Sequence, residues 1–222
     1  MSMETGEISR RAILPGAAAL VVPRHVLGGR GYQAPSDTLN IAGVGVGGMG
    51  RRYLQACESE RIVALCDVDL GFAAKVFKRY PKATVYRDFR QMLDKEKGID
   101  AVIIGTPDHS HAVVLMAALR LRKHVYCAKP LTHTLFEART VANATREAGV
   151  ATQMSVQSSA SDAAQSTAEL LLSGAIGPVH EVHVWCDHPL YPAGVQRPKD
   201  TPAVPEAMDW DLWIGPAPYR PY

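Results

Sequence analysis

The sequence predicts an α/β protein with a doubly wound parallel sheet, followed by the start of an incomplete α+β second domain. Short apolar runs alternate with helical patterns from residue 37 to residue 156, which is typical of βαβ units. A glycine-rich loop directly follows the first apolar run. After Gly177 the composition changes, because nine of the 15 prolines and all three tryptophans lie there. We therefore expect a complete domain over 37–156, and a linker helix with the truncated start of a second domain over 157–222.

The expected strands are short apolar runs, and they occupy residues 39–44, 61–66, 84–86, 101–105, 124–127 and 150–154. The run A-V-I-I-G at 101–105 is apolar throughout, which is typical of a strand that is buried on both faces of a parallel sheet. Residues 179–185 read V-H-E-V-H-V-W instead. This alternation predicts a strand with one buried face.

The expected helices lie between these strands, at residues 49–57, 70–80, 89–93, 108–121 and 135–148. In the first of them Met49, Tyr53 and Leu54 share one face. The helix over 70–80 should stop at Pro81, and the last should end at Gly149, because these residues commonly end helices.

Composition excludes several classes of protein. Of 222 residues, 47% are hydrophobic and 21% are charged, which excludes a disordered chain, a collagen-like repeat and a polytopic membrane protein. The formal net charge of +2 argues against a nucleic-acid binder, which would carry a basic stripe. The four cysteines form no C-x-x-C pair, so neither a zinc site nor a disulfide framework is indicated. Cys66 and Cys127 lie in apolar runs and are expected to be buried free thiols.

Residues 1–31 resemble an export leader. Arg10 and Arg11 precede an apolar run that reaches Val22, an order typical of a twin-arginine signal. The run is shorter than the ~20 residues that a membrane-spanning helix needs, so no stable membrane anchor is expected. We therefore expect a periplasmic or secreted protein. The alternative is a cytoplasmic protein with a frayed N-terminal tail.

The glycine-rich loop carries the main functional prediction. Residues 45–50 read G-V-G-G-M-G, which is G-x-G-x-x-G between an expected strand and an expected helix. In a Rossmann fold Gly45 would permit the tight turn, Gly47 the approach of a pyrophosphate, and Gly50 close packing of helix and strand. Gly48 and Met49 complete the loop at the helix N-terminus, where N–H groups bind phosphate.

Asp67 follows the second expected strand, 22 residues after Gly45. An acid at about this spacing binds the adenosine ribose hydroxyls of a dinucleotide. Its carboxylate would repel a 2′-phosphate, so NAD is favoured over NADP. Asp69 could assist, but capping the next helix is the preferred interpretation.

Longer motifs resemble the Gfo/Idh/MocA family of NAD(P)-dependent oxidoreductases, and in particular its secreted bacterial branch. They read V-G-V-G-G-M-G-R at 44–51, C-D-V-D at 66–69, G-T-P-D-H-S-H at 105–111, H-V-Y-C-A-K-P-L at 124–131, G-A-I-G-P-V at 174–179 and D-W-D-L-W-I-G-P-A-P at 209–218. The resemblance implies hydride transfer between a hydroxyl-bearing carbon and nicotinamide. It also implies a sugar, cyclitol or related polyol as substrate.

The resemblance also implies roles for individual residues. The loop at Thr106 and Pro107 would pass beside the nicotinamide, and His111 matches a recurring histidine of the family. Lys129 matches the lysine that reaches the substrate at the cofactor ring, and Gln157 would contact cofactor or substrate. A metal site at Asp108, His109 and His111 is set aside, because a third or fourth convergent ligand is lacking.

Three departures from the family pattern leave alternatives open. Ala128 replaces the family's glutamate, and Ser155-Val156 lacks its asparagine. The chain also ends shortly after the second domain begins, although that domain supplies an acid and a histidine in the family and commonly mediates oligomers. An NAD-binding pseudoenzyme or fragment without turnover is therefore one alternative, and an NAD-dependent glycoside hydrolase is another. Trp185, Trp210 and Trp213 are interpreted as anchors of the Pro-rich segment or as residues awaiting the missing sheet, in preference to a sugar-stacking platform.

Overall fold

A computed structural model describes residues 34, 37–185, 194 and 196–222. The expected leader, residues 1–31, lies outside these residues and stays a prediction. None of the described helices is both long enough and apolar enough to cross a membrane.

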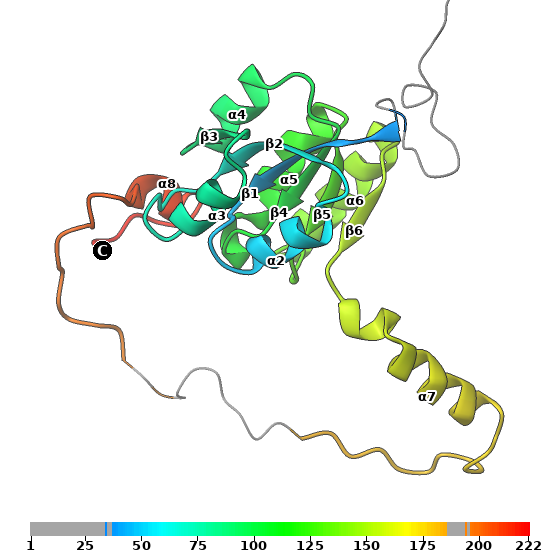
Figure 1. Cartoon of the computed structure of the whole chain (residues 1–222). Helices are drawn as coiled ribbons and strands as arrows, with labels where there is room; N and C mark the ends of the chain where they lie inside the picture. Colours follow the sequence, from blue (N-terminus) through cyan, green and yellow to red (C-terminus); the bar gives the residue numbers. More distant parts are fainter. Residues whose placement is uncertain (1–33, 35–36, 186–193, 195) are drawn as a thin grey trace, which may run out of the picture. The chain divides into compact units, whose positions relative to one another are not determined.

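Six strands form a parallel sheet in the order β3-β2-β1-β4-β5-β6 (Figure 1). Their bounds are β1 Asn40–Val44, β2 Arg61–Cys66, β3 Thr84–Tyr86, β4 Ala101–Ile104, β5 His124–Cys127 and β6 Thr152–Met154. The expected doubly wound sheet is confirmed, and its order is that of a Rossmann fold. The winding direction reverses between β1 and β4. A ligand is therefore expected at the carboxyl ends of these two strands.

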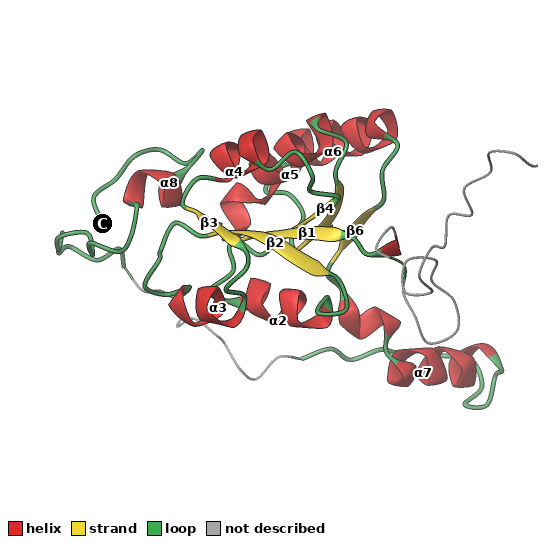
Figure 2. Cartoon of the chain, turned by 45° about the horizontal axis from the view of Figure 1, so that its top comes forward, coloured by secondary structure: helices red, strands yellow, loops and turns green. Residues whose placement is uncertain are grey.

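Helices cover both faces of the sheet (Figure 2). One face carries α4 (Phe89–Lys95), α5 (His111–Arg120) and α6 (Leu135–Ala148), and the other carries α2 (Met49–Ala56) and α3 (Ala74–Arg79). Because side chains alternate along a strand, each central strand contributes side chains to the hydrophobic cores on both faces of the sheet. In β4, Val102 and Ile104 are buried in the core that contains residues of α4, α5 and α6, whereas Ile103 is buried in the core that contains residues of α2 and α3.

The ends of α6 follow from its flanking residues. The Thr134 hydroxyl accepts the Glu137 N–H, and the Glu137 carboxylate accepts the Thr134 N–H, which forms a capping box. At the other end Gly149 has φ 64°, a left-handed conformation that glycine adopts without strain. The expected helix over 135–148 is confirmed at both ends.

Two expected helices begin later than their patterns suggest. Of residues 70–80 only Ala74–Arg79 is α-helical, because the carboxylate of Asp69 accepts the Phe72 N–H and holds the preceding residues in a turn. Likewise, residues 108–110 form a 3₁₀ turn, η2, before α5 begins at His111.

The strand expected over residues 179–185 is wrong. These residues form no strand, and the apolar Val182 and Val184 are 75% and 90% exposed. A strand needs a hydrogen-bonded neighbour, and the described part of the chain pairs none with this segment. The preceding helix α7 (Asp162–Leu172) occupies the position of the expected linker helix and has no buried residue.

The C-terminal segment returns to the sheet. Leu70 N–H donates to the Ala207 carbonyl, Asp209 N–H donates to the Val68 carbonyl, and Met208 forms an antiparallel bridge with Asp69. The short helix α8 (Trp210–Ile214) follows, and its Ile214 is buried. This segment therefore packs against the Rossmann domain instead of building a core of its own.

Candidate functional site

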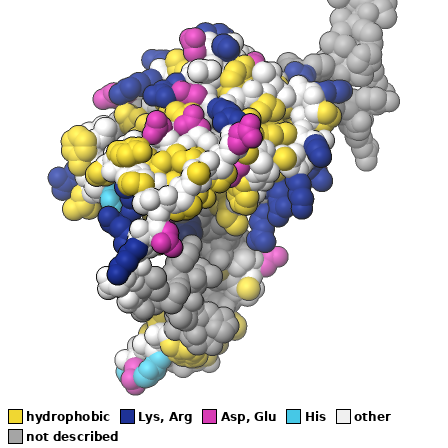
Figure 3. Space-filling model, turned by 90° about the vertical axis from the view of Figure 1, so that its left-hand side faces the viewer, with side chains coloured by type: hydrophobic (Ala, Val, Ile, Leu, Met, Phe, Trp, Pro, Cys, Tyr) yellow, Lys and Arg dark blue, Asp and Glu magenta, His cyan; other side chains and the backbone are white. Residues whose placement is uncertain are grey.

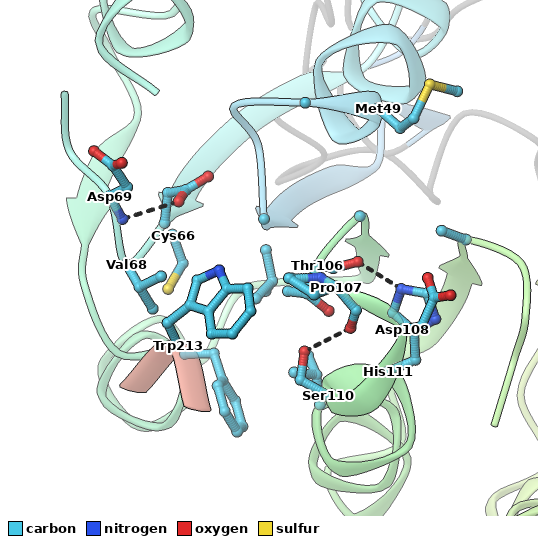
Figure 4. A pocket seen from close by; sticks show the side chains of 18 of the residues that line it. Met49, Cys66, Val68, Asp69, Thr106, Pro107, Asp108, Ser110, His111 and Trp213 are labelled. Atoms are coloured by element: carbon cyan, nitrogen blue, oxygen red, sulfur yellow. Dashed lines mark hydrogen bonds between the residues drawn. The ribbon is translucent and has the colours of Figure 1, made fainter. Parts of the chain in front are cut away.

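A cavity of about 630 Å³ opens at the carboxyl ends of the central strands (Figure 4). Among its lining residues are most of those that the sequence predicted for the site: Gly45, Gly48, Met49, Asp67, Thr106, Pro107, His111, Lys129 and Gln157. Gly47 and Gly50 do not line it. The fold thus brings together residues that lie up to 112 positions apart, as 157 − 45 shows.

The glycine loop fits its predicted geometry. Gly45 has φ 74°, and a Cβ there would lie 2.5 Å from the Thr106 nitrogen. A Cβ on Gly50 would collide with the Gly45 carbonyl oxygen, and one on Gly47 would collide with the Phe72 ring. Backbone atoms therefore exclude a side chain at Gly45 and Gly50, and the positive φ of Gly45 also favours glycine, whereas at Gly47 the obstacle is the ring of Phe72, which is 65% exposed.

Gly105 completes this packing, and sequence reasoning assigned it no role. A Cβ on Gly105 would lie 2.6 Å from Gly50 Cα, so the two glycines let the end of β4 approach the first turn of α2. Its place directly after an apolar strand is the signal that could have identified it.

Asp67 is 9% exposed, and its carboxylate binds the glycine loop. One oxygen, Oδ2, accepts the N–H groups of Val46 and Gly47 at 2.8 and 2.9 Å. The other, Oδ1, accepts the Asp69 N–H at 3.1 Å. A carboxylate has about four acceptor positions, so roughly one remains for a ribose hydroxyl. Burial raises the pKa of Asp67 above its usual value, against the opposing effect of these three hydrogen bonds.

Two further observations fit a dinucleotide. No side chain caps α2 at Gly48, so N–H groups of its first turn are available to an anion such as a pyrophosphate. The Thr106 hydroxyl is buried at the cavity and has no hydrogen-bond partner among the described residues. A buried hydroxyl without a partner is costly, and a polar ligand in the cavity would supply one.

His111 lies at the cavity but is fully buried. Its Nδ1 is 2.6 Å from the Pro130 carbonyl oxygen, and its Nε2 is 2.7 Å from the Thr106 carbonyl oxygen. Each carbonyl can only accept, so a neutral ring satisfies one of them and an imidazolium satisfies both. In this structure the histidine joins the loops that follow β4 and β5.

Lys129 is exposed at the cavity, and Ser155 fixes its backbone. The Lys129 N–H donates to Ser155 Oγ at 3.1 Å, and that oxygen lies 2.9 Å from the Tyr53 hydroxyl. Ser155 is 1% exposed, so its hydroxyl is shielded from bulk water. Sequence reasoning noted residue 155 only as a departure from the family pattern. Its supporting role depends on contacts between residues that are far apart in sequence.

Ala128 is 8% exposed and packs in the core beside Ile103 and Tyr53. No described residue forms a hydrogen bond or an ion pair with the Lys129 ammonium group. The lysine is therefore oriented through its backbone, and its ammonium group is available to a ligand.

The residues considered for a metal site have other partners. His109 Nε2 lies 2.8 Å from the Trp213 carbonyl oxygen, and both nitrogens of His111 face carbonyls. Within the described ranges no three His, Cys, Asp or Glu side chains lie together as metal ligands would.

The thiols behave as expected of buried groups. Cys66 is 2% exposed, and burial raises its pKa strongly, with smaller contributions from Asp67 and Asp88. Burial raises the pKa of Cys127 to about 12. Neither thiol is suited to act as a nucleophile near neutral pH.

The C-terminal segment supplies one wall of the cavity, through Met208, Leu212 and Trp213. Sequence reasoning did not place these residues in the site. Trp210 and Trp213 stack with ring centroids 4.8 Å apart, which agrees with the interpretation of these tryptophans as anchors. Trp185 is 81% exposed.

Comparison with known proteins matches residues 39–156 to the Gfo/Idh/MocA family, described as an oxidoreductase family with an NAD-binding Rossmann fold. The chain is similar to inositol 2-dehydrogenase from Salmonella typhimurium, with 32% identity over 117 residues that make up 50% of this chain and 34% of that protein. It thus spans about a third of that relative's length.

Two solved structures are also similar. An NAD binding oxidoreductase from Klebsiella pneumoniae shares 31% identity with a TM-score of 0.55, over 63% of this chain and 40% of that one. A myo-inositol 2-dehydrogenase from Lactobacillus plantarum shares the fold at 23% identity and a TM-score of 0.59, over 63% of this chain and 42% of that one.

Proposed function

The chain belongs to the Gfo/Idh/MocA oxidoreductase family, and from that premise we propose that it is an NAD-dependent dehydrogenase acting on a hydroxyl of a cyclitol, sugar or related polyol. The observation that carries the proposal is the convergence of the glycine loop, Asp67 and Lys129 on one cavity. The substrate class is supported by the 32% identity to an inositol 2-dehydrogenase. The matched region covers 34% of that relative.

The residues that would hold NAD are those at the switch point of the sheet. The first turn of α2 would bind the pyrophosphate, and the remaining acceptor position of Asp67 would bind the adenosine ribose. Thr106 offers its unpartnered hydroxyl to the bound cofactor. The cofactor, when bound, supplies the hydride acceptor of the reaction.

Lys129 would hold the reacting hydroxyl. Its ammonium group can donate a hydrogen bond to the hydroxyl oxygen and stabilise the negative charge that develops there as the carbon loses hydride. The Ser155 hydroxyl holds the Lys129 backbone and so positions the side chain at the cavity. The hydroxyl proton would pass to water at the exposed Lys129 end of the cavity, because Ala128 offers no carboxylate to receive it.

NAD is proposed over NADP because the buried Asp67 carboxylate stands where a 2′-phosphate would lie. Arg87 also lines the cavity, and arginine is the residue type that accommodates a 2′-phosphate. Asp67 and Arg87 thus favour different cofactors, and titrating the protein with NAD and with NADP measures which of the two binds more tightly. A dissociation constant for NADP equal to or below that for NAD would contradict the preference.

The cofactor assignment is tested by the melting temperature of the full chain as NAD is added. A ligand that binds only the native state stabilises it by about 2.7 kcal/mol at 100 times its dissociation constant. We expect the shift to shrink in Asp67→Ala and to persist in Asp94→Ala, whose carboxylate is exposed and paired with Lys97. The assignment fails if wild type shows no shift or if Asp67→Ala shows the full shift.

Turnover is tested by the appearance of NADH across a panel of cyclitols and sugars. Lys129→Ala should lower the rate about a hundredfold or more, the usual cost of removing a donor to a developing oxyanion, while Lys82→Ala at an exposed site should not.

A second candidate function is favoured by Ala128 and the unpaired Lys129 ammonium group: a protein that holds NAD without turnover. NAD binding with no NADH from any member of the panel would select this pseudoenzyme. Turnover that depends on Lys129 would exclude it.

Location and assembly are further proposals. Arg10, Arg11 and the apolar run to Val22 support export by the twin-arginine route. Exchanging both arginines for lysine in a reporter fusion should abolish export. An equal amount of exported reporter would contradict this route. A homo-oligomer through a complete second domain also remains a proposal.

A further inference from the structure

The C-terminal wall of the cavity is attached to a defined part of the sheet. The backbone of residues 207–209 is hydrogen-bonded to Val68 and Leu70, and Met208 pairs with Asp69. These partners directly follow Asp67 in the chain. The wall therefore stands beside the acid that receives the ribose of the adenosine half, away from the Lys129 end of the site.

Trp213 is the aromatic residue of this wall. Figure 4 shows its indole ring at the cavity, between Val68 and Cys66 on one side and Thr106 and Pro107 on the other. It packs on Trp210 at 4.8 Å with an interplanar angle of 14°, and on His109 at 5.1 Å and 53°. The Trp213 carbonyl oxygen also lies 2.8 Å from His109 Nε2. The indole is thus held by contacts with both Trp210 and His109.

The surroundings of Trp213 suit a flat, weakly polar group. Met208, Leu212 and Val68 line the cavity beside it, and Trp210 is held by a hydrogen bond from its indole N–H to the Arg220 carbonyl at 2.8 Å. In Figure 3 hydrophobic side chains gather on the side of the molecule turned toward the viewer. A purine base presents a π-face to such a ring and is attached to the ribose that Asp67 would bind.

We propose that Trp213 and the docked segment 207–214 form the adenine subsite of the cofactor cavity, so that residues at least 140 positions beyond Asp67, as 207 − 67 shows, complete the site. This inference rests on the proposed NAD function. Trp213 determines affinity for the adenosine half of the dinucleotide and leaves the nicotinamide half unaffected. Adenosine binding, in turn, stabilises the docked state of α8, because ligand binding and docking are linked.

The test compares ligands that carry one half of the dinucleotide, with the full chain throughout. In Trp213→Ala we expect the dissociation constants of AMP and NAD to rise about tenfold, the usual effect of removing a base-stacking aromatic side chain. The dissociation constant of nicotinamide mononucleotide, which lacks adenine, should not change. Trp213→Phe keeps a π-face and should lose less affinity than Trp213→Ala.

A spectroscopic readout keeps the test independent of folding defects in Trp213→Ala. Because the chain has three tryptophans, Trp185→Phe combined with Trp210→Phe leaves Trp213 as the only indole. Its fluorescence should be quenched by AMP and unaffected by nicotinamide mononucleotide. Amide hydrogen exchange in α8 should also slow when AMP is bound to the wild-type chain.

The outcomes separate this inference from the proposed function. If wild type binds no NAD, both are wrong. If wild type binds NAD but Trp213→Ala binds AMP equally or more tightly, the subsite is overturned and the NAD function stands. Tighter binding would mean that the indole itself fills the space of the base. Absence of quenching by saturating AMP also overturns the subsite.

Discussion

Asp67 combines a structural task with the proposed binding task. Two of the three N–H groups that its carboxylate accepts belong to the glycine loop, so it shapes the loop before any ligand arrives. The sequence spacing predicted the ribose role alone. The structure adds that a change at Asp67 would also affect the loop that is proposed to bind the pyrophosphate, because its N–H groups would lose their acceptor.

The raised pKa of Asp67 predicts a pH dependence of stability. Burial makes the folded carboxyl bind its proton more tightly than the unfolded one, whose pKa is about 3.9. Its stabilising contribution is therefore complete below that value and is lost as pH rises through the folded pKa. The difference in unfolding free energy between wild type and Asp67→Asn should decline over this window.

Urea unfolding at a series of pH values measures this difference, and the subtraction removes the contribution of the other acids. The measurements are made without NAD, so that the decline in the difference reports the titration of Asp67 and not a change in cofactor binding. A difference that is flat, or that rises with pH, would contradict the assigned direction.

The buried network at Ser155 predicts an energetic coupling. Ser155→Ala leaves the Lys129 N–H and the Tyr53 hydroxyl without this partner, at a cost of about 1–3 kcal/mol in unfolding free energy. Tyr53→Phe should then cost less in the Ser155→Ala background than in wild type. A double-mutant cycle should give a coupling of about 0.5–3 kcal/mol, and strict additivity would contradict the network.

At the scale of elements, the approach of β4 to α2 depends on a pair of glycines. Gly105 lies against Gly50, and a Cβ on Gly105 would overlap Gly50 Cα at 2.6 Å. Helix and strand must separate to relieve such an overlap. The separation would displace the helix N-terminus that is proposed to bind the pyrophosphate.

Gly105→Ala should therefore lower the unfolding free energy by about 1–3 kcal/mol and weaken NAD binding, because overpacking moves α2. Gly98→Ala is the matched control, since a Cβ there meets nothing within 4 Å. The control should change stability by no more than about 0.5 kcal/mol. Equal behaviour of the two variants in urea melts and NAD titrations would contradict the packing argument.

For the whole molecule, the cavity and the hydrophobic core share residues. Cys127 lies deep in the core that contains α5 and α6, and Cys66 lies in the same core while also lining the cavity. Cys57 is only partly buried. Burial raises the pKa of all three thiols, most strongly for Cys66 and Cys127.

Thiol labelling should therefore distinguish surface from core in a Cys186→Ser background, which removes the cysteine outside the described residues. We expect Cys57 to react first and Cys66 and Cys127 to react only on unfolding, because the thiolate is the reactive form. Added NAD should slow the last two by the same factor. Native-state labelling of Cys66 or Cys127 as fast as that of Cys57 would contradict a closed core.

The sequence by itself determined the α/β alternation, the six strands of the sheet, the glycine loop and the positions of Asp67 and Lys129. These features are local in sequence. The periods of strands and helices can be recognised within a short segment, and the glycine loop and Asp67 lie within one predicted strand–helix–strand unit. Only the tertiary structure decided that Gly105 meets Gly50, that Ser155 supports Lys129 and that Trp213 lines the cavity. It also decided that residues 179–185 remain unpaired. Such outcomes depend on which distant segments meet, and a periodic pattern carries no information about its partner.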